Sequence, residues 1–99
     1  MYVVREIMHC KPGQVRPMVE KFKAMSKLTK QMGAKAFRVL TDVSGEQYWT
    51  VIAELEVEKL DMFTQPQKPT AADKKMEKIM KGYHDLIIDG RREIYKLEK

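Results

Sequence analysis

The chain has 99 residues, a formal net charge of +5 and a single cysteine, Cys10. That length predicts one domain, residues 1–99, with no room for a second. Cys10 cannot form an intrachain disulfide, and the eight methionines would be oxidised easily outside a reducing compartment, so we expect a cytoplasmic protein. The N-terminal residues lack a signal-peptide pattern, and no stretch approaches the ~20 apolar residues of a membrane span.

The positive charge does not predict nucleic-acid binding. The lysines are spread over two predicted helices and interleaved with Glu and Asp, whereas nucleic-acid sites cluster basic residues with aromatic or polar readers. A metal site is not expected either, because His9 and His84 are far apart in the sequence and no Cys-x-x-Cys pair occurs. We therefore expect neither nucleic acid, nor a membrane, nor a metal ion as a partner.

The first two predicted elements are a strand and a helix. Residues 2–10 are rich in β-forming side chains and end at a Lys-Pro-Gly turn signal, which predicts a strand. Between residues 14 and 32 apolar side chains recur at helical spacing, and Gly33 follows as a stop signal. Pro17 is compatible with the first turn of this helix, where its missing amide would have no intrahelical partner.

Residues 35–43 and 47–57 predict two more strands. They flank a short hairpin at 44–46, in which Gly45 can take a positive φ. Side chains alternate across a strand, so one set of side chains in the 47–57 strand is expected to lie under the helices: Trp49, Val51, Ala53, Leu55 and Val57. The other set is expected on the opposite, open face: Tyr48, Thr50, Ile52, Glu54 and Glu56.

The last third of the chain predicts helices and a closing strand. Residues 58–65 indicate a short helix before a Pro-containing break, and Thr70 then opens a longer helix, with Asp73 as a loose capping partner. Residues 85–90 fit either a helix end or a strand start, and 91–97 predict the final strand. The βαββαβ order predicts an α+β ferredoxin-like plait: a four-stranded antiparallel sheet with helices on one face and a bare face that needs a partner.

The placed elements resemble a known superfamily. The segment 4–6 (Val-Arg-Glu) leads into 11–14 (Lys-Pro-Gly-Gln), an amphipathic helix, Gly33 and the 44–46 hairpin. This arrangement covers nearly the whole chain and resembles the dimeric α/β-barrel superfamily, in particular its NIPSNAP-like and antibiotic-biosynthesis-monooxygenase-like domains. The resemblance implies a homodimer whose two sheets pack face to face, with a small cavity between each sheet and its covering segments.

Candidate site residues come from the residue types and from this resemblance. His84 is the catalytic candidate, because haem-degrading members of the superfamily would place a histidine there that faces the cavity and ligates iron. A single histidine at a helix end can instead interact with the helix dipole. The ligand-binding candidates are Arg5, Glu6, Arg38, Tyr48, Glu54, Phe63 and Tyr83.

Charged strand residues need partners. Arg5 and Glu6 point to opposite faces, so one of them lies toward the dimer cavity or the helix layer, where an unpaired charge is costly. Glu54 can pair with Arg5 or Arg38, either as a structural ion pair or as part of an arginine site for a carboxylate. His9, at the end of a strand beside a turn, is expected to be solvated.

Several functions remain open at this point. A cofactor-free monooxygenase acting on a phenol or anthrone needs a cavity that deprotonates its substrate, to which Trp49, Tyr48, Arg38 and His84 could contribute. Haem-degrading relatives use an asparagine on the first strand and a tryptophan after the third; Glu6 and Phe63 stand nearest, and the chain contains no asparagine. We predict a homodimer that binds a hydrophobic or aromatic small molecule without a cofactor; the alternatives are a non-catalytic binding or regulatory module and a haem-handling protein.

Overall fold

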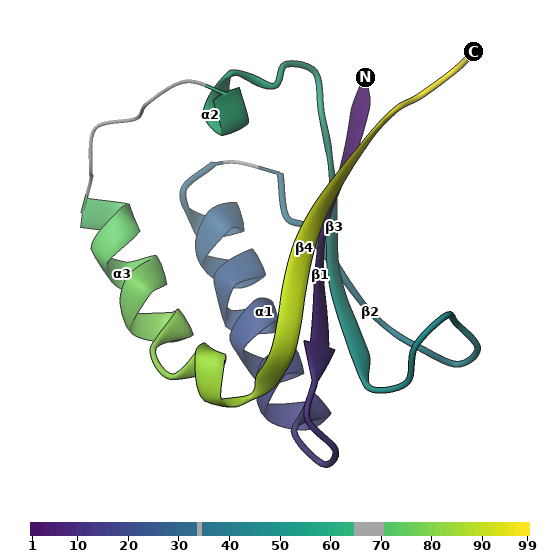
Figure 1. Cartoon of the computed structure of the whole chain (residues 1–99). Coiled ribbons are helices and arrows are strands. Elements are labelled where there is room, and N and C mark those ends of the chain that lie inside the picture. The colour runs from purple at the N-terminus through teal and green to yellow at the C-terminus, as the bar shows by residue number, and fades with distance from the viewer. Residues whose placement is uncertain (34, 65–70) are drawn as a thin grey trace.

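The structure is a computed structural model that describes residues 1–33, 35–64 and 71–99 (Figure 1). Its elements follow the predicted order, with a 3₁₀ turn, η1, added before the last strand. They are β1 (Tyr2–Cys10), α1 (Val15–Gln31), β2 (Arg38–Thr41), β3 (Thr50–Val57), α2 (Asp61–Thr64), α3 (Ala71–Met80), η1 (Tyr83–Asp85) and β4 (Ile87–Lys96).

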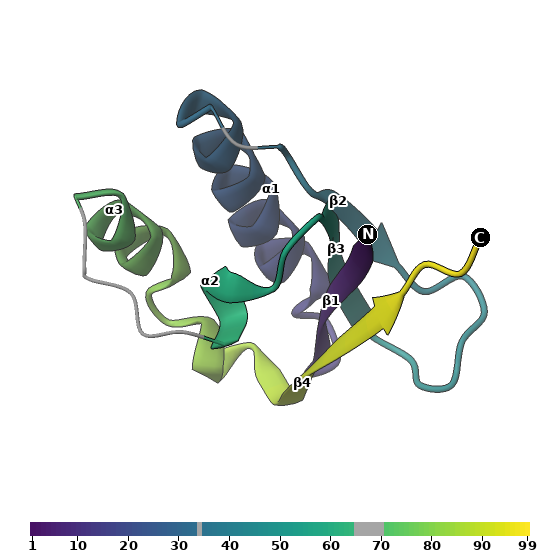
Figure 2. The same ribbon diagram turned by 90° about the horizontal axis from the view of Figure 1, so that it is seen from above.

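The four strands form one antiparallel sheet in the order β2-β3-β1-β4. The helices all lie on one side of this sheet, and its other face carries none of them (Figure 2). We call that other side the open face. This arrangement confirms the predicted α+β ferredoxin-like plait with helices on one face of a four-stranded sheet.

The core lies between the sheet and α1. Its buried residues come from β1, α1 and β3: Cys10, Met18, Val19, Phe22, Val51 and Ala53. Val51 and Ala53 were predicted to face the helices, and both do. The end of α1 is tied to the chain before β2, because the Ser26 hydroxyl donates to the Phe37 carbonyl (2.7 Å) and accepts from the Phe37 amide (3.1 Å).

The second long helix is held by α1. The Lys21 ammonium of α1 donates hydrogen bonds to the carbonyl oxygens of Ile79 (3.1 Å) and Lys81 (2.7 Å), at the C-terminal end of α3. The last carbonyls of a helix have no intrahelical partner and carry partial negative charge, so a cation stabilises them there. Gly82 follows with φ +83°, a left-handed conformation that ends the helix.

The first strand and helix agree with their predicted limits. β1 spans the predicted residues, and α1 begins and ends one residue inside the predicted range. Pro17 lies in its first turn. Gly33 follows the helix with φ +84°, which places a glycine where the backbone turns left-handed.

The predicted hairpin between the second and third strands is wrong in length. Both strands are shorter than expected, and residues 42–49 form a longer loop. Asp42 closes it: the Thr50 amide donates to its carboxylate (2.8 Å), and its own amide donates to the Thr50 carbonyl (3.3 Å). The positive φ falls on Trp49 (61°) and not on Gly45. Trp49 therefore leaves the strand alternation, and 44% of it is exposed instead of lying in the core.

The ambiguous segment before the last strand divides between two elements. η1 ends at Asp85 and β4 starts at Ile87, four residues earlier than the predicted strand. Strand β4 pairs with β1 along its length, with a register irregularity between His9 and Cys10. The predicted cap at Thr70 and the end of the short helix at residue 65 lie outside the described residues.

Met18→Ala should destabilise the fold. Met18 is fully buried in the core, and removing most of a buried methionine side chain costs about 2–5 kcal/mol, since contacts are lost and a cavity remains. Urea unfolding measures this free energy. Met32→Ala is the matched control, since 51% of Met32 is exposed, and it should change stability by less than about 0.5 kcal/mol. Equal effects of the two substitutions would contradict the assigned core.

Candidate functional site

The predicted site residues separate into two groups on opposite sides of the sheet. Arg5, Arg38 and Glu54 meet on the open face. Glu6, Phe63, Tyr83 and His84 lie on the helix side, near the β4 edge. The eighth residue, Tyr48, joins neither group, because it lies in the 42–49 loop with 83% of its surface exposed.

The open-face group is an ion-pair cluster that crosses three strands. The sheet register places Glu54 of β3 directly between Arg5 of β1 and Arg38 of β2. Arg5 Nε donates to Glu54 Oε2 (2.8 Å), and Arg38 Nη2 donates to Glu54 Oε1. Glu54 is 7% exposed. The hydrogen bond from Arg5, with a further one from Arg38, holds the pKa of the Glu54 carboxyl below its ordinary value.

A second set of charges continues across the open face onto β4. The Arg5 guanidinium lies 5.3 Å from the centre of the Tyr95 ring. The Tyr95 hydroxyl donates to Glu93 Oε1 (2.7 Å), and Arg91 Nε donates to Glu93 Oε2 (2.8 Å). The hydrogen bond between Tyr95 and Glu93 lowers the pKa of the Glu93 carboxyl and raises the pKa of the Tyr95 hydroxyl.

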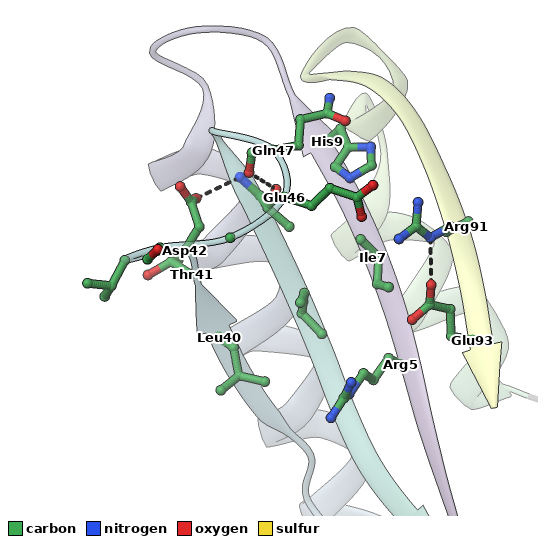
Figure 3. A pocket seen from close by; sticks show the side chains of 15 residues that line it. Arg5, Ile7, His9, Leu40, Thr41, Asp42, Glu46, Gln47, Arg91 and Glu93 are labelled. Carbon is green, nitrogen blue, oxygen red and sulfur yellow. Dashed lines mark hydrogen bonds and ion pairs between the residues drawn. The ribbon is translucent and has the colours of Figure 1, made fainter. Parts of the chain in front are cut away.

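A pocket of about 400 Å³ lies at one end of the open face, which we call the open-face pocket (Figure 3). The apolar side chains Ile7, Ile52 and Leu40 line it from the strands, and residues 42–47 line it from the β2–β3 loop. His9 and Arg91 also line it, and Figure 3 shows both projecting from the sheet on the same side. The pocket therefore combines an apolar floor with ionisable groups.

His9 is the residue of this pocket that the prediction placed wrongly. It is 7% exposed, not solvated, and its Nδ1 lies 2.5 Å from Asp89 Oδ1. Asp89 reaches it because β1 and β4 pair with His9 opposite Asp89. The start of β4 was ambiguous in the sequence, so this partner could not be identified. A predicted last strand that began before residue 89 would have identified the partner, since it places Asp89 opposite His9.

Three residues of the helix-side group, Glu6, Tyr83 and His84, line a groove of about 490 Å³ between η1 and the β1–β4 edge, which we call the helix-side groove. Glu6 pairs with Arg92, whose guanidinium lies 4.8 Å from the centre of the Phe63 ring. The Tyr83 and His84 rings have centroids 3.9 Å apart. The groove is lined by Glu6, Met8, Tyr83, His84, Ile87, Ile88, Asp89, Gly90, Arg91 and Arg92.

Gly90 helps to keep the helix-side groove open. A Cβ atom at this position would lie 2.8 Å from the Met8 sulfur and 3.4 Å from the Ile7 carbonyl oxygen. Any other residue would therefore push the Met8 side chain aside. Because Gly90 and Met8 face each other across β4 and β1, the glycine leaves the apolar Met8 surface accessible from the groove.

Other chemistry has little support in the described parts of the chain. Within residues 1–33, 35–64 and 71–99, no three His, Cys, Asp or Glu side chains gather in a way that could hold a metal ion. Cys10 is buried, and burial raises the pKa of its thiol, which disfavours the nucleophilic thiolate. None of the described helices has the length and apolar character needed to cross a membrane.

Glu54→Gln should destabilise the protein by about 1–2 kcal/mol at neutral pH, because the buried carboxylate loses charged hydrogen bonds while both arginines keep contact with water. The pKa of Glu54 in the native state lies below its ordinary value of 4.5. Its contribution is therefore complete above about pH 4.5 and is lost as the pH falls through the lowered native pKa.

Denaturant unfolding of wild type and Glu54→Gln at several pH values measures this contribution. The difference in unfolding free energy should be constant near neutrality and shrink below about pH 4.5. Glu20→Gln is the control, because Glu20 forms an exposed pair with Arg16 on α1, and its effect should stay below about 0.5 kcal/mol. A difference that grows on acidification would contradict the assigned ion pairs.

Comparisons with known proteins identify the fold. No protein-family model matches the sequence, and neither does any curated protein. Protein Atu4242 from Agrobacterium tumefaciens superposes with a TM-score of 0.77 at 14% identity, over 100% of this chain and 95% of that one. An antibiotic biosynthesis monooxygenase-like protein from Deinococcus radiodurans gives a TM-score of 0.66 at 14% identity, over 100% and 94%.

A NIPSNAP-like domain protein from Burkholderia xenovorans gives a TM-score of 0.60 at 13% identity, over 98% of this chain and 84% of that one. The predicted resemblance is thus confirmed at the level of architecture. The chain shares the ferredoxin-like α+β fold of solved structures that include an antibiotic biosynthesis monooxygenase-like protein and a NIPSNAP-like domain protein.

Proposed function

We propose that the chain is a cytoplasmic homodimer that binds a hydrophobic or aromatic small molecule in the helix-side groove. The observation that carries this proposal is the convergence of Glu6, Tyr83 and His84 on that groove, with Phe63 joined to it through Arg92. These residues come from opposite ends of the chain. Ligand sites commonly combine such apolar and aromatic walls with a few polar groups that orient the ligand.

The groove suits a flat apolar molecule with one polar substituent. Met8 and Ile87, which also pack against the core, supply apolar surface. Tyr83 and His84 supply aromatic rings on which a ligand ring can pack. The Glu6–Arg92 pair supplies both a hydrogen-bond acceptor and a donor for a hydroxyl or carbonyl group.

The more specific form of this proposal is that the groove is the active site of a cofactor-free monooxygenase. A cofactor-free monooxygenase must remove a proton from its substrate, and His84 is an exposed imidazole on the wall of the groove. Near neutral pH an imidazole can accept a phenolic proton. The fold shared with an antibiotic biosynthesis monooxygenase-like protein is consistent with this chemistry. If the protein binds its ligand but consumes no oxygen, the groove is the binding site of a non-catalytic module.

Haem, which the resemblance implies through His84, does not fit the residues present. His84 is exposed and its ring lies against Tyr83. The groove also carries the Glu6–Arg92 ion pair, where a macrocycle would need a broad apolar slot. We therefore propose a protein that works without a bound cofactor.

The homodimer is proposed to form through the open face. Apolar side chains reach this face, including Leu40, which is 39% exposed, and Ile52. Each carboxylate that the strand register places on it has a basic partner: Glu54 with Arg5 and Arg38, Glu93 with Arg91, Asp89 with His9, and Glu56 with Lys35. A second copy can cover paired charges at a much lower desolvation cost than unpaired ones.

Leu40→Lys should weaken the dimer, since it places a charge within the covered face. Sedimentation equilibrium at micromolar concentration should show a dimer for wild type and a dissociation constant raised about tenfold or more for the variant, the loss expected for a buried apolar contact. Met32→Lys is the matched control, because Met32 lies after α1 on the helix side and is also exposed. A monomeric wild type would contradict the dimer.

His84→Ala should weaken ligand binding in the groove. With 2-naphthol as the probe, wild-type amide signals of residues 83–85 should shift in NMR spectra, and His84→Ala should raise the dissociation constant about tenfold through loss of an aromatic contact and a hydrogen bond. Asp85→Ala is the matched control in the same turn. Shifts confined to other regions would contradict the groove as the site.

Two further measurements separate the functional alternatives. Oxygen uptake with a panel of phenols and anthrones, lost in His84→Ala, would support the monooxygenase; binding without uptake would support the non-catalytic module. A Soret band on haem titration that disappears in His84→Ala would contradict the proposal of a cofactor-free protein.

A further inference from the structure

His9, a buried residue paired with Asp89, lines the open-face pocket and takes no part in the proposed groove, whereas Asp89 lies at the β4 edge and lines the groove. His9 stands on β1, and Asp89 stands opposite it on β4. The His9 side chain is 9% exposed, whereas that of Asp89 is 63% exposed. A histidine buried against a carboxylate at the wall of a pocket has the arrangement of an oriented acid–base group.

The hydrogen bond determines which ring nitrogen can react. An ionised carboxylate only accepts hydrogen bonds, so Nδ1 of His9 carries the hydrogen in its contact with Asp89 Oδ1. In the neutral ring, Nε2 then holds the lone pair. Among the described residues, no buried side-chain nitrogen or oxygen lacks a hydrogen-bond partner, and no hydrogen bond from Nε2 to a described residue is seen. Nε2 is therefore open to the pocket that His9 lines.

Arg91 is placed to stabilise an anion in the same pocket. Its contact with Glu93 uses Nε, and 49% of its side chain remains exposed. In Figure 3 its guanidinium and the His9 ring lie on the same side of the sheet, with Glu46 and Gln47 of the loop reaching toward them. The other ionisable groups that line the pocket are Arg5, Asp42, Glu46 and Glu93.

We propose that the His9–Asp89 pair accepts a proton from a small, weakly acidic hydroxyl compound, an enol or a phenol, bound on the Ile7 and Ile52 surface. The ligand O–H bond breaks, its proton passes to His9 Nε2, and the electron pair stays on the ligand oxygen beside Arg91. Asp89 balances the charge of the imidazolium. The proton returns when the ligand leaves as the neutral compound, so no oxidant or reductant is needed.

This inference goes beyond the proposed function, because the accepting residue, His9, lines the open-face pocket and not the helix-side groove, although Asp89 and Arg91 on the β4 edge also line the groove. It is also compatible with a dimer. Loop residues 42–47 line the pocket together with the strands, so the chain itself already covers part of this end of the face. A second sheet laid on the open face would close the pocket further.

The test uses p-nitrophenol, whose anion absorbs visible light and whose neutral form does not. Bound to the full chain, it should ionise at lower pH than in free solution, and His9→Gln should weaken its binding about tenfold or more through loss of a charge-assisted hydrogen bond. Asp89→Asn should move the ionisation back toward that of free p-nitrophenol, because the imidazolium loses its counter-charge. Asp85→Asn, a matched change on the helix side, should alter neither.

A second measurement does not depend on the variants. In nitrogen NMR spectra of the wild-type histidine rings, saturating p-nitrophenol should shift the His9 Nε2 signal toward that of a protonated nitrogen. The His84 ring provides the internal comparison for the helix-side groove. An unmoved His9 signal, or an ionisation change that survives in folded His9→Gln, would overturn the site. Failure of 2-naphthol to shift the amide signals of residues 83–85 would bear only on the groove, because none of these residues lines the open-face pocket.

Discussion

The constraint on which the structure depends is the pairing of β1 with both β3 and β4. A strand that is paired on both sides cannot rotate, so its side chains alternate strictly between the two faces of the sheet. Arg5, Ile7 and His9 therefore face the open side, while Met8 and Cys10 face the helices. A slip by one residue would exchange the two sets and bury the charged side chains in the core.

The same pairing explains how the open face tolerates so many charges. Glu54 stands between arginines from both neighbouring strands, and Glu93 stands beside Arg91. The register between strands brings Glu54 to its two arginines, whereas Arg91 and Glu93 share a face because they lie two residues apart on β4. Paired charges are less costly to cover than single ones, which makes this face compatible with a second copy of the chain.

The two sites differ in how they are held. In the open-face pocket, His9 and Arg91 come from paired strands, which limits their movement. In the helix-side groove, Tyr83 and His84 come from a single 3₁₀ turn that leads into β4. The fold alone does not choose between these sites, since one fold supports many functions. The choice rests on the side chains that line each pocket.

The sequence by itself determined the elements whose signal is local. Apolar periodicity and flanking turn residues predicted β1 and α1 almost to the residue, because both patterns are contained within a few turns or one strand. Period-two alternation also assigned Val51 and Ala53 to the core and Glu54 to the open face, where it was predicted to meet Arg5 or Arg38. These inferences held since neighbouring strands share the same alternation.

Only the tertiary structure decided the contacts between distant segments. Trp49 lies outside the core, against the prediction, because the β2–β3 loop extends to it and its backbone is left-handed. The short hairpin predicted from the sequence would have kept Trp49 in the strand. His9 and Asp89 are 80 residues apart, and they meet through a register that begins in a segment with no clear local preference. Pairing of this kind depends on the packing of the whole sheet, and no local pattern encodes it.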